Sequence, residues 1–135
     1  MADKKSILAI DDLPLELAIY RNILGRQFDL HIAGSAPDAL KQLDTLDVDL
    51  IILDIEMPDM SGFEFLHQIR LMPRLMHTPV IIVSSYSSTE FVEHALSQGA
   101  NDLMPKPVNP ADLFRRIIRL VESGPPANKL TQLLL

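Results

Sequence analysis

The stretch Leu50-Ile51-Ile52-Leu53-Asp54 decides the fold, because an unbroken apolar run leads directly into a carboxylate. A short run of this kind is typical of a strand buried on both faces of a parallel sheet. Chemically active groups follow apolar runs elsewhere too: Asp11 and Asp12 follow Ile7–Ile10, Ser84 follows Val80–Val83, and Lys106 comes shortly after Leu103-Met104. In an open parallel sheet, ligands bind at the carboxyl ends of the strands. We therefore expect these groups to form one metal-dependent site that accepts a phosphoryl group.

Short apolar runs alternate with amphipathic segments five times, which predicts βαβ units and a five-stranded parallel sheet of the α/β class. The expected strands are Ser6–Ile10, Asp29–Ala33, Leu50–Asp54, Pro79–Ser84 and Asp102–Met104. Two of the expected helices are Pro14–Gln27 and Phe63–Met72. A further helix is capped by Ser35 and runs to Leu46, and another is capped by Ser88 or Thr89 and runs to Gln98, before Gly99. The last is capped by Asn109, begins at Pro110 and stops at Gly124.

Length and composition restrict the class of protein. The chain has 135 residues, enough for one domain with a sizeable core, and its N-terminus lacks the apolar segment of a signal peptide. No apolar run approaches the roughly 20 residues that a membrane span needs. The absence of cysteine excludes disulfides and thiolate metal sites and suits the cytoplasm. A net charge of −6 argues against nucleic-acid binding, which depends on Lys and Arg.

The three aspartates predict a cation site. Asp11, Asp12 and Asp54 would repel one another when crowded together, so at least one pKa should rise without a cation. Mg²⁺ relieves this repulsion, since it prefers carboxylate oxygens together with a phosphate oxygen. A plainer interpretation stays open beside this one: Asp11 and Asp12 cap the helix that comes after them.

Asp54 is the expected nucleophile, because carboxylates form aspartyl phosphates in phosphoryl transfer. The protein then has mainly to position the transferring group and neutralise its charge, which Lys106 suits as a compact cation on a long side chain. Ser84 would donate its hydroxyl to a phosphoryl oxygen. Taken singly, a lysine is more often a solvated surface residue, and a strand-end serine is more often bonded to backbone; the combination is what indicates function.

These segments together resemble the receiver domain of bacterial two-component response regulators, similar to the chemotaxis regulators, over about Lys5 to Ser123. The similar segments are Ile7–Asp12, Leu53–Pro58 with Gly62, Val80–Ser85, Gly99–Asp102 and Lys106-Pro107. Their order and spacing are highly specific. The resemblance implies a flavodoxin-like sheet with strand order 2-1-3-4-5.

The resemblance also implies roles for individual residues. Asp54 would accept phosphate from a histidine kinase or phosphotransfer protein. Mg²⁺ would be held by Asp11, Asp12 and Asp54 together with the main-chain carbonyl of Glu56. Ser84 and Lys106 would contact the phosphoryl group, and the Lys106–Pro107 bond would be cis. The domain would catalyse only its own phosphorylation and dephosphorylation and would not be a dedicated enzyme.

Several residues depart from the family pattern. Receivers carry Tyr or Phe on the fifth strand as a rotamer switch, and Leu103 occupies that position here. Ser85 replaces the usual Ala or Gly after Ser84, and Pro105 stiffens the approach to the lysine. Glu56 and Tyr86 occupy variable positions that flank the site in this family.

The resemblance covers residues 1–123 as the receiver domain, which leaves residues 124–135 as a tail or the start of a linker to an output domain. This tail ends in the apolar residues Leu130 and Leu133–Leu135. In many receivers the fourth helix, fifth strand and fifth helix form the face for a dimer, a partner or an output domain. Arg115, Arg116 and Arg119 fall on that last helix, where a solvated polar face is the default.

Two other functions stay open. A receiver-like interaction scaffold could keep the fold and work without phosphorylation, and Leu103 favours this alternative. A phosphatase of the haloacid-dehalogenase type also uses an aspartate and magnesium, but its second Asp lies two residues after the nucleophile, where this chain has Glu56. The chain has no Gly-rich phosphate loop that would indicate nucleotide binding.

Overall fold

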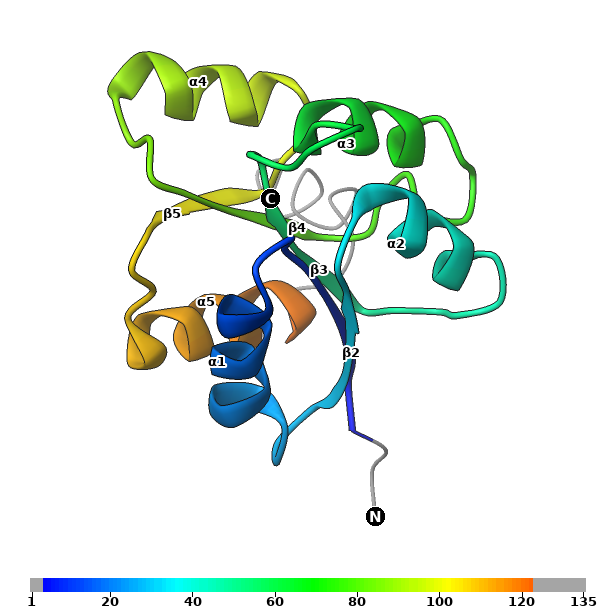
Figure 1. Cartoon of the computed structure of the whole chain (residues 1–135), viewed down its shortest axis with the longest axis vertical. Helices are drawn as coiled ribbons and strands as arrows, with labels where there is room; N and C mark the ends of the chain where they lie inside the picture. Colours follow the sequence, from blue (N-terminus) through cyan, green and yellow to red (C-terminus); the bar gives the residue numbers. More distant parts are fainter. Residues whose placement is uncertain (1–3, 123–135) are drawn as a thin grey trace, which may run out of the picture.

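The computed structural model describes residues 4–122 and contains a five-stranded parallel sheet with helices on both faces (Figure 1). The strands are β1 (Ser6–Ile10), β2 (Asp29–Ala33), β3 (Leu50–Asp54), β4 (Val80–Ser84) and β5 (Asp102–Pro105). The helices are α1 (Pro14–Leu24), α2 (Ala36–Leu43), α3 (Gly62–Arg70), α4 (Thr89–Ser97) and α5 (Pro110–Glu122). The strand order β2-β1-β3-β4-β5 confirms the expected fold class. The expected tail, residues 124–135, lies outside the described residues.

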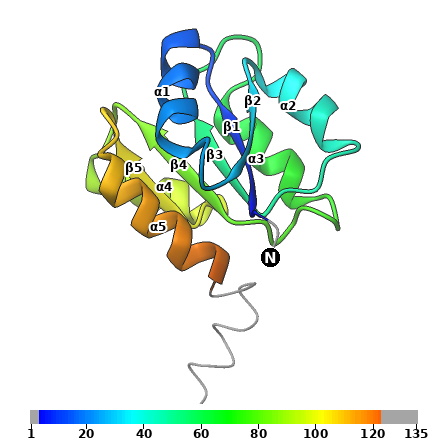
Figure 2. The same cartoon turned by 90° about the horizontal axis from the view of Figure 1, so that it is seen from below.

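The sheet is buried on both faces, as the apolar run of β3 predicts. Helices α2, α3 and α4 pack on one face, where Ile51 and Leu53 of β3 point, and α1 and α5 pack on the other face against Leu50 and Ile52 (Figures 1 and 2). Alternate residues of β3 therefore belong to two separate cores, because successive side chains of a strand point to opposite faces.

Helices α1 to α4 each end before the predicted residue, α4 by a single residue at Ser97. Helix α1 ends at Leu24, with Gly25 at its C-cap, instead of at Gln27. After α2 and α3 the chain continues in turns. There the amides of Asp44 and Leu71 donate to carbonyl oxygens three residues back. Such tightened last turns are not α-helix, and sequence periodicity does not distinguish them from it.

The predicted caps are confirmed. Ser35 Oγ accepts the amide of Asp38 at 3.1 Å, and Asn109 Oδ1 accepts that of Asp112 at 2.9 Å. Of the two candidates for α4, Ser88 is the cap. Gly99 follows α4 with a φ of 105°, the left-handed conformation that ends many helices.

Helix α1 has no side-chain cap. Its N-cap is Leu13, so the interpretation of Asp11 and Asp12 as capping residues is wrong. Asp11 Oδ1 instead accepts the amide of Leu13 at 3.0 Å, in the loop before the helix.

The strand register brings the carboxyl ends of the strands to one edge. Ile10, the last residue of β1, lies beside Leu53, and Asp54 lies beside Val83, which precedes Ser84. None of the helices within residues 4–122 is long and apolar enough to cross a membrane.

Candidate functional site

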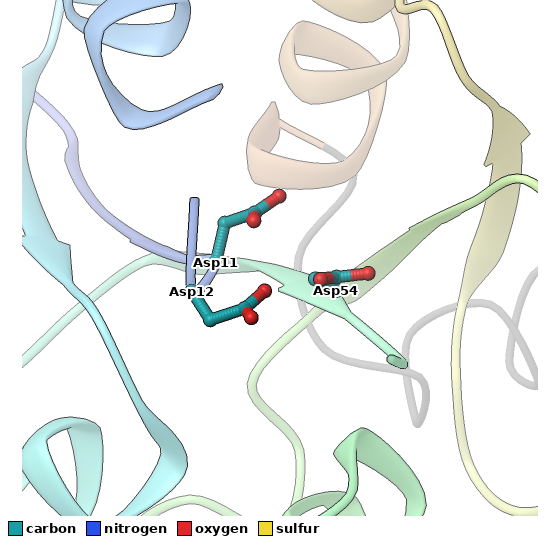
Figure 3. Close-up of side chains that lie close together, drawn as sticks. All are labelled: Asp11, Asp12 and Asp54. Carbon is teal, nitrogen blue, oxygen red and sulfur yellow. The ribbon is translucent and has the colours of Figure 1, made fainter. Parts of the chain in front are cut away.

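Three aspartates meet at the carboxyl edge of the sheet, from two adjacent strands. Asp54 is the last residue of β3, while Asp11 and Asp12 follow β1 directly. Each offers a carboxylate oxygen, and these oxygens lie within 4.8 Å of one another (Figure 3). Asp11 is fully buried and Asp54 is 3% exposed, so the cluster is largely shielded from water. The prediction that these side chains converge is confirmed.

Lys106 reaches the cluster from the loop after β5. Its Nζ lies 3.1 Å from Asp11 Oδ2 and 3.4 Å from Asp54 Oδ1. Burial disfavours the charged ammonium, but the hydrogen bond and charge of Asp11, with the charge of Asp54, outweigh it and raise the pKa of Lys106. The amide of Lys106 donates to the carbonyl oxygen of Ser84 at 2.9 Å, and the Lys106–Pro107 bond is cis, as the resemblance implies.

The charge of the cluster is not balanced by the protein. Burial, with the negative charge of Asp11, raises the pKa of Asp54 to about 6, although Lys106 opposes this rise. The direction is the one expected for crowded aspartates, although burial contributes more to the rise than the charge of Asp11 does. One ammonium faces three carboxylates, which leaves a formal charge of about −2 for a ligand to neutralise.

Backbone packing fixes the position of Asp54. The amide of Glu56 donates to Asp54 Oδ1 at 3.2 Å, and the amide of Gly62 donates to Ile55 O at 3.0 Å. A Cβ on Gly62 would lie 2.5 Å from the carbonyl oxygen of Asp54, so α3 can begin this close to β3 only with glycine there. The sequence contains this glycine within the family motif, but its packing role depends on where α3 meets β3.

The two serines at the carboxyl end of β4, Ser84 and Ser85, differ in their surroundings. A shallow cavity of about 220 Å³ lies over the cluster, lined by Asp12, Leu13, Asp54, Glu56, Ser85 and Lys106. Ser84 is fully buried and does not line this cavity; its Oγ accepts the amide of Tyr86 at 3.0 Å. The structure thus brings together the predicted acids, the lysine and Glu56, whereas the Ser84 hydroxyl is turned to backbone. Sequence reasoning missed the place of Ser85 in the cavity wall.

Ionisable side chains outside the cluster pair with other acidic residues. His31 Nε2 lies 3.1 Å from Asp29 Oδ2 on β2. Arg116 and Arg119 pair with Asp102 at 2.9 and 3.2 Å, which ties α5 to the start of β5. Within residues 4–122, no second group of three acidic or histidine side chains converges closely enough to hold a metal.

Residues 7–118 match the response regulator receiver domain, and the chain belongs to this family. It is 35% identical over 117 residues to the two-component response regulator ORR5 of rice (Oryza sativa subsp. japonica), covering 85% of this chain and 87% of that protein. It is also 36% identical over 104 residues to a probable cyclic di-GMP phosphodiesterase of Vibrio cholerae, covering 77% of this chain but only 24% of that protein.

Solved structures agree with this assignment. The chemotaxis protein CheY4 of Vibrio cholerae superposes with a TM-score of 0.82 at 27% identity, over 87% of this chain and 98% of that one. A CheY-like receiver domain from Methanospirillum hungatei JF-1 also gives 0.82, at 30% identity, over 90% and 96% of the two chains. The relatives include plant as well as bacterial proteins, so a bacterial origin stays a prediction.

Proposed function

We propose that this domain is a phosphoacceptor that receives a phosphoryl group on Asp54 from the phosphohistidine of a histidine kinase or phosphotransfer protein. One observation carries the proposal: a buried carboxylate at the end of β3 lies 3.4 Å from the ammonium of Lys106 and is flanked by Asp11 and Asp12. Asp54, Lys106 and Asp12 thus line one small cavity, while Asp11 is buried within contact of Lys106.

In the transfer step, a carboxylate oxygen of Asp54 attacks phosphorus and a P–O bond forms as the donor's P–N bond breaks. The electron pair of that bond returns to the ring nitrogen of the donor. Because the ring is protonated at its other nitrogen, it leaves as neutral imidazole. Lys106 neutralises charge on the phosphoryl oxygens, and its contact with Asp11 keeps it in place beside Asp54. Hydrolysis of the aspartyl phosphate by water later restores the carboxylate.

The residues fit a bound Mg²⁺. Asp11, Asp12 and Asp54, with the main-chain carbonyl of Glu56, are hard oxygen donors, and the cluster has a formal charge of about −2 that a divalent cation would balance. When bound, Mg²⁺ neutralises charge on the transferring group.

Phosphorylation would change which partner the domain binds, with no metabolic reaction of its own. The face of α4, β5 and α5 is the proposed contact for a partner, an output domain or a second copy. On this face Arg116 and Arg119 already pair with Asp102, so a partner that binds their charges would compete with these pairs.

The chain's lack of cysteine favours the cytoplasm.

Intact-mass spectrometry after incubation with acetyl phosphate tests the proposal. We expect a magnesium-dependent gain of one phosphoryl group in the wild type and in Asp112→Asn, an acidic residue on α5 away from the cluster, but not in Asp54→Asn. If the folded, magnesium-replete wild type gains no mass with acetyl phosphate or with a phosphorylated histidine phosphotransfer protein, the proposal fails.

A phosphorylation-independent scaffold is the second candidate, favoured by one observation: Leu103 stands at the aromatic switch position and is buried in the core. The phosphatase alternative has no such support, since Asp54 ends β3 and Glu56 lies two residues beyond it.

A further inference from the structure

We propose that Tyr86 positions Ser84 through its backbone amide, and that the ring contacts of Tyr86 transmit the phosphorylation state of Asp54 to α4 and α3. The inference rests on the proposed function, because it concerns the structural response to phosphorylation of Asp54. In other receivers an aromatic residue on the fifth strand responds to phosphorylation; in this domain we assign that response to Tyr86 in the loop after β4.

The first step is the bond between Ser84 and Tyr86. Ser84 Oγ accepts the Tyr86 amide at 3.0 Å, is fully buried, and lies outside the cavity over Asp54. The hydroxyl therefore reaches a phosphoryl group on Asp54 only after the Ser84 side chain rotates. This rotation breaks the bond from the Tyr86 amide, so the orientation of Ser84 and the backbone at Tyr86 are coupled.

The second step is a series of ring contacts that leads away from Tyr86. The ring centroid of Tyr86 lies 5.7 Å from that of Phe91 on α4, and Phe91 lies 5.8 Å from Phe63 on α3. Phe63 in turn lies 4.8 Å from His94, one turn further along α4. Tyr86 is 58% exposed, so burial alone does not hold its ring, and the contact with Phe91 is what orders it.

Strand β5 carries no aromatic ring, because Leu103 occupies the switch position. Leu103 is 7% exposed and packs in the core that includes Ala95 and Ala100. Its carbonyl oxygen accepts Arg116 Nη1 at 3.1 Å, which fixes the strand to α5. A buried leucine without a ring offers no aromatic switch, whereas Tyr86, two residues after Ser84, carries a ring that packs against Phe91.

Fluorotyrosine labelling tests this assignment, because the chain has only two tyrosines. Tyr20 lies on α1 and is buried, and the two ¹⁹F resonances are told apart with Tyr20→Phe and Tyr86→Phe. The probe is Mg²⁺ with beryllofluoride, which mimics a phosphoryl group on a carboxylate. We expect the Tyr86 resonance to shift in the wild type and to stay in place in Ser84→Ala carrying bound beryllofluoride.

Binding itself is followed by thermal shift, with Asp54→Asn as the blank. A wild type that binds beryllofluoride while its Tyr86 resonance stays in place would overturn the inference but not the proposed function. A shift that persists in Ser84→Ala would overturn it as well. A wild type that binds no beryllofluoride would remove the proposed function and, with it, the inference.

A matched pair of ring deletions tests the contact directly. Phe91→Leu removes the partner of Tyr86, whereas Phe114→Leu removes a ring that lies 5.5 Å from Phe28 on the other face of the sheet. Losing the Phe91 ring weakens the resting arrangement, so we expect beryllofluoride to bind about threefold more tightly in that variant. Phe114→Leu should bind it as the wild type does. Equal affinities in the two variants would overturn the inference.

Discussion

Lys106 and Arg70 are partly buried cations at opposite ends of the same sheet, and they face different neighbours. The ammonium of Lys106, at the carboxyl end, lies between the carboxylates of Asp11 and Asp54. The guanidinium of Arg70, at the amino end, faces neutral oxygens only; these are Gly99 O at 2.8 Å, Leu75 O at 3.0 Å and Asn101 Oδ1 at 3.3 Å. Within the described part of the chain, no carboxylate pairs with Arg70.

The pKa values of the two side chains shift in opposite directions. Burial lowers the pKa of Arg70, whereas Asp11 and Asp54 outweigh burial at Lys106 and raise its pKa. The carboxyl end retains an excess of negative charge that a ligand can neutralise, while the amino end satisfies its polar groups internally. We therefore propose that a similar pattern of cation and oxygen serves phosphoryl transfer at one end of the sheet and stability at the other.

Removing the two cations should separate these roles. In Lys106→Met we expect phosphorylation of Asp54 by acetyl phosphate to slow about 500-fold, or about 3.7 kcal/mol, because the phosphoryl charge loses its fixed counterion. Arg70→Met should keep the wild-type rate. Time-resolved intact-mass spectrometry measures both rates, and equal slowing in the two variants would contradict the comparison.

Replacing one glycine at each end of the sheet with alanine compares the packing of the two ends through the free energy of unfolding. Gly62→Ala places a Cβ 2.5 Å from the backbone oxygen of Asp54, which should lower the free energy of unfolding by about 3 kcal/mol. Gly99→Ala places a Cβ 3.1 Å from the flexible Arg70 side chain, at a φ of 105°, and should cost about 1.5 kcal/mol. Urea unfolding measures both losses. A larger loss for Gly99→Ala would show that the amino end is the more tightly packed.

Arg70→Met should lower the free energy of unfolding by about 2.5 kcal/mol, because the carbonyl oxygen of Gly99 loses both of its bonds from Arg70 and that of Leu75 keeps only the amide of Thr78. The control is Arg115→Met, whose side chain is 75% exposed beside Asp112 and should cost no more than about 0.5 kcal/mol. Denaturant titration compares the two variants. Similar losses in both would mean that Arg70 stabilises no more than a surface arginine does.

Asp54→Asn should stabilise the metal-free protein at pH 8, by about 2 kcal/mol. The pKa of Asp54 is about 6 in the folded protein, above the ordinary value of 3.8, so between these values the folded state binds more protons than the unfolded chain. Wild-type stability therefore falls as the pH rises from about 4 to 6, and the variant lacks this loss. Thermal unfolding in EDTA from pH 4 to 8 measures the difference, which should vanish near pH 4. A constant difference across this range would argue against a raised pKa.

Much of the fold was predictable because β1, β3 and β4 are compact apolar runs that lead into polar residues. The bounds of β1, β2 and β3 were predicted to the residue. The caps at Ser35 and Asn109 were also predictable, since a capping bond joins residues only three apart in the sequence. The missed helix ends, in contrast, depend on local hydrogen bonds that apolar periodicity does not record.

The acid cluster and Lys106 were predictable for a different reason. In a parallel sheet, the residue after each strand falls at one edge, so a sequence pattern becomes a spatial cluster. The bond of Ser84 to backbone matches the plainer expectation for a strand-end serine, since its partner, the Tyr86 amide, is only two residues away. The role of Arg70 was hidden, since its oxygen partners come from segments up to 31 residues away.

The amino-acid sequence by itself determined the strands, the parallel sheet and the groups gathered at its carboxyl edge, because strand period and strand ends are local properties. Only the tertiary structure decided how these groups face one another. It placed Lys106 between two carboxylates and connected the Tyr86 ring to α4 and α3. These relations depend on distances between segments far apart in the chain, which are set when the helices pack onto the sheet.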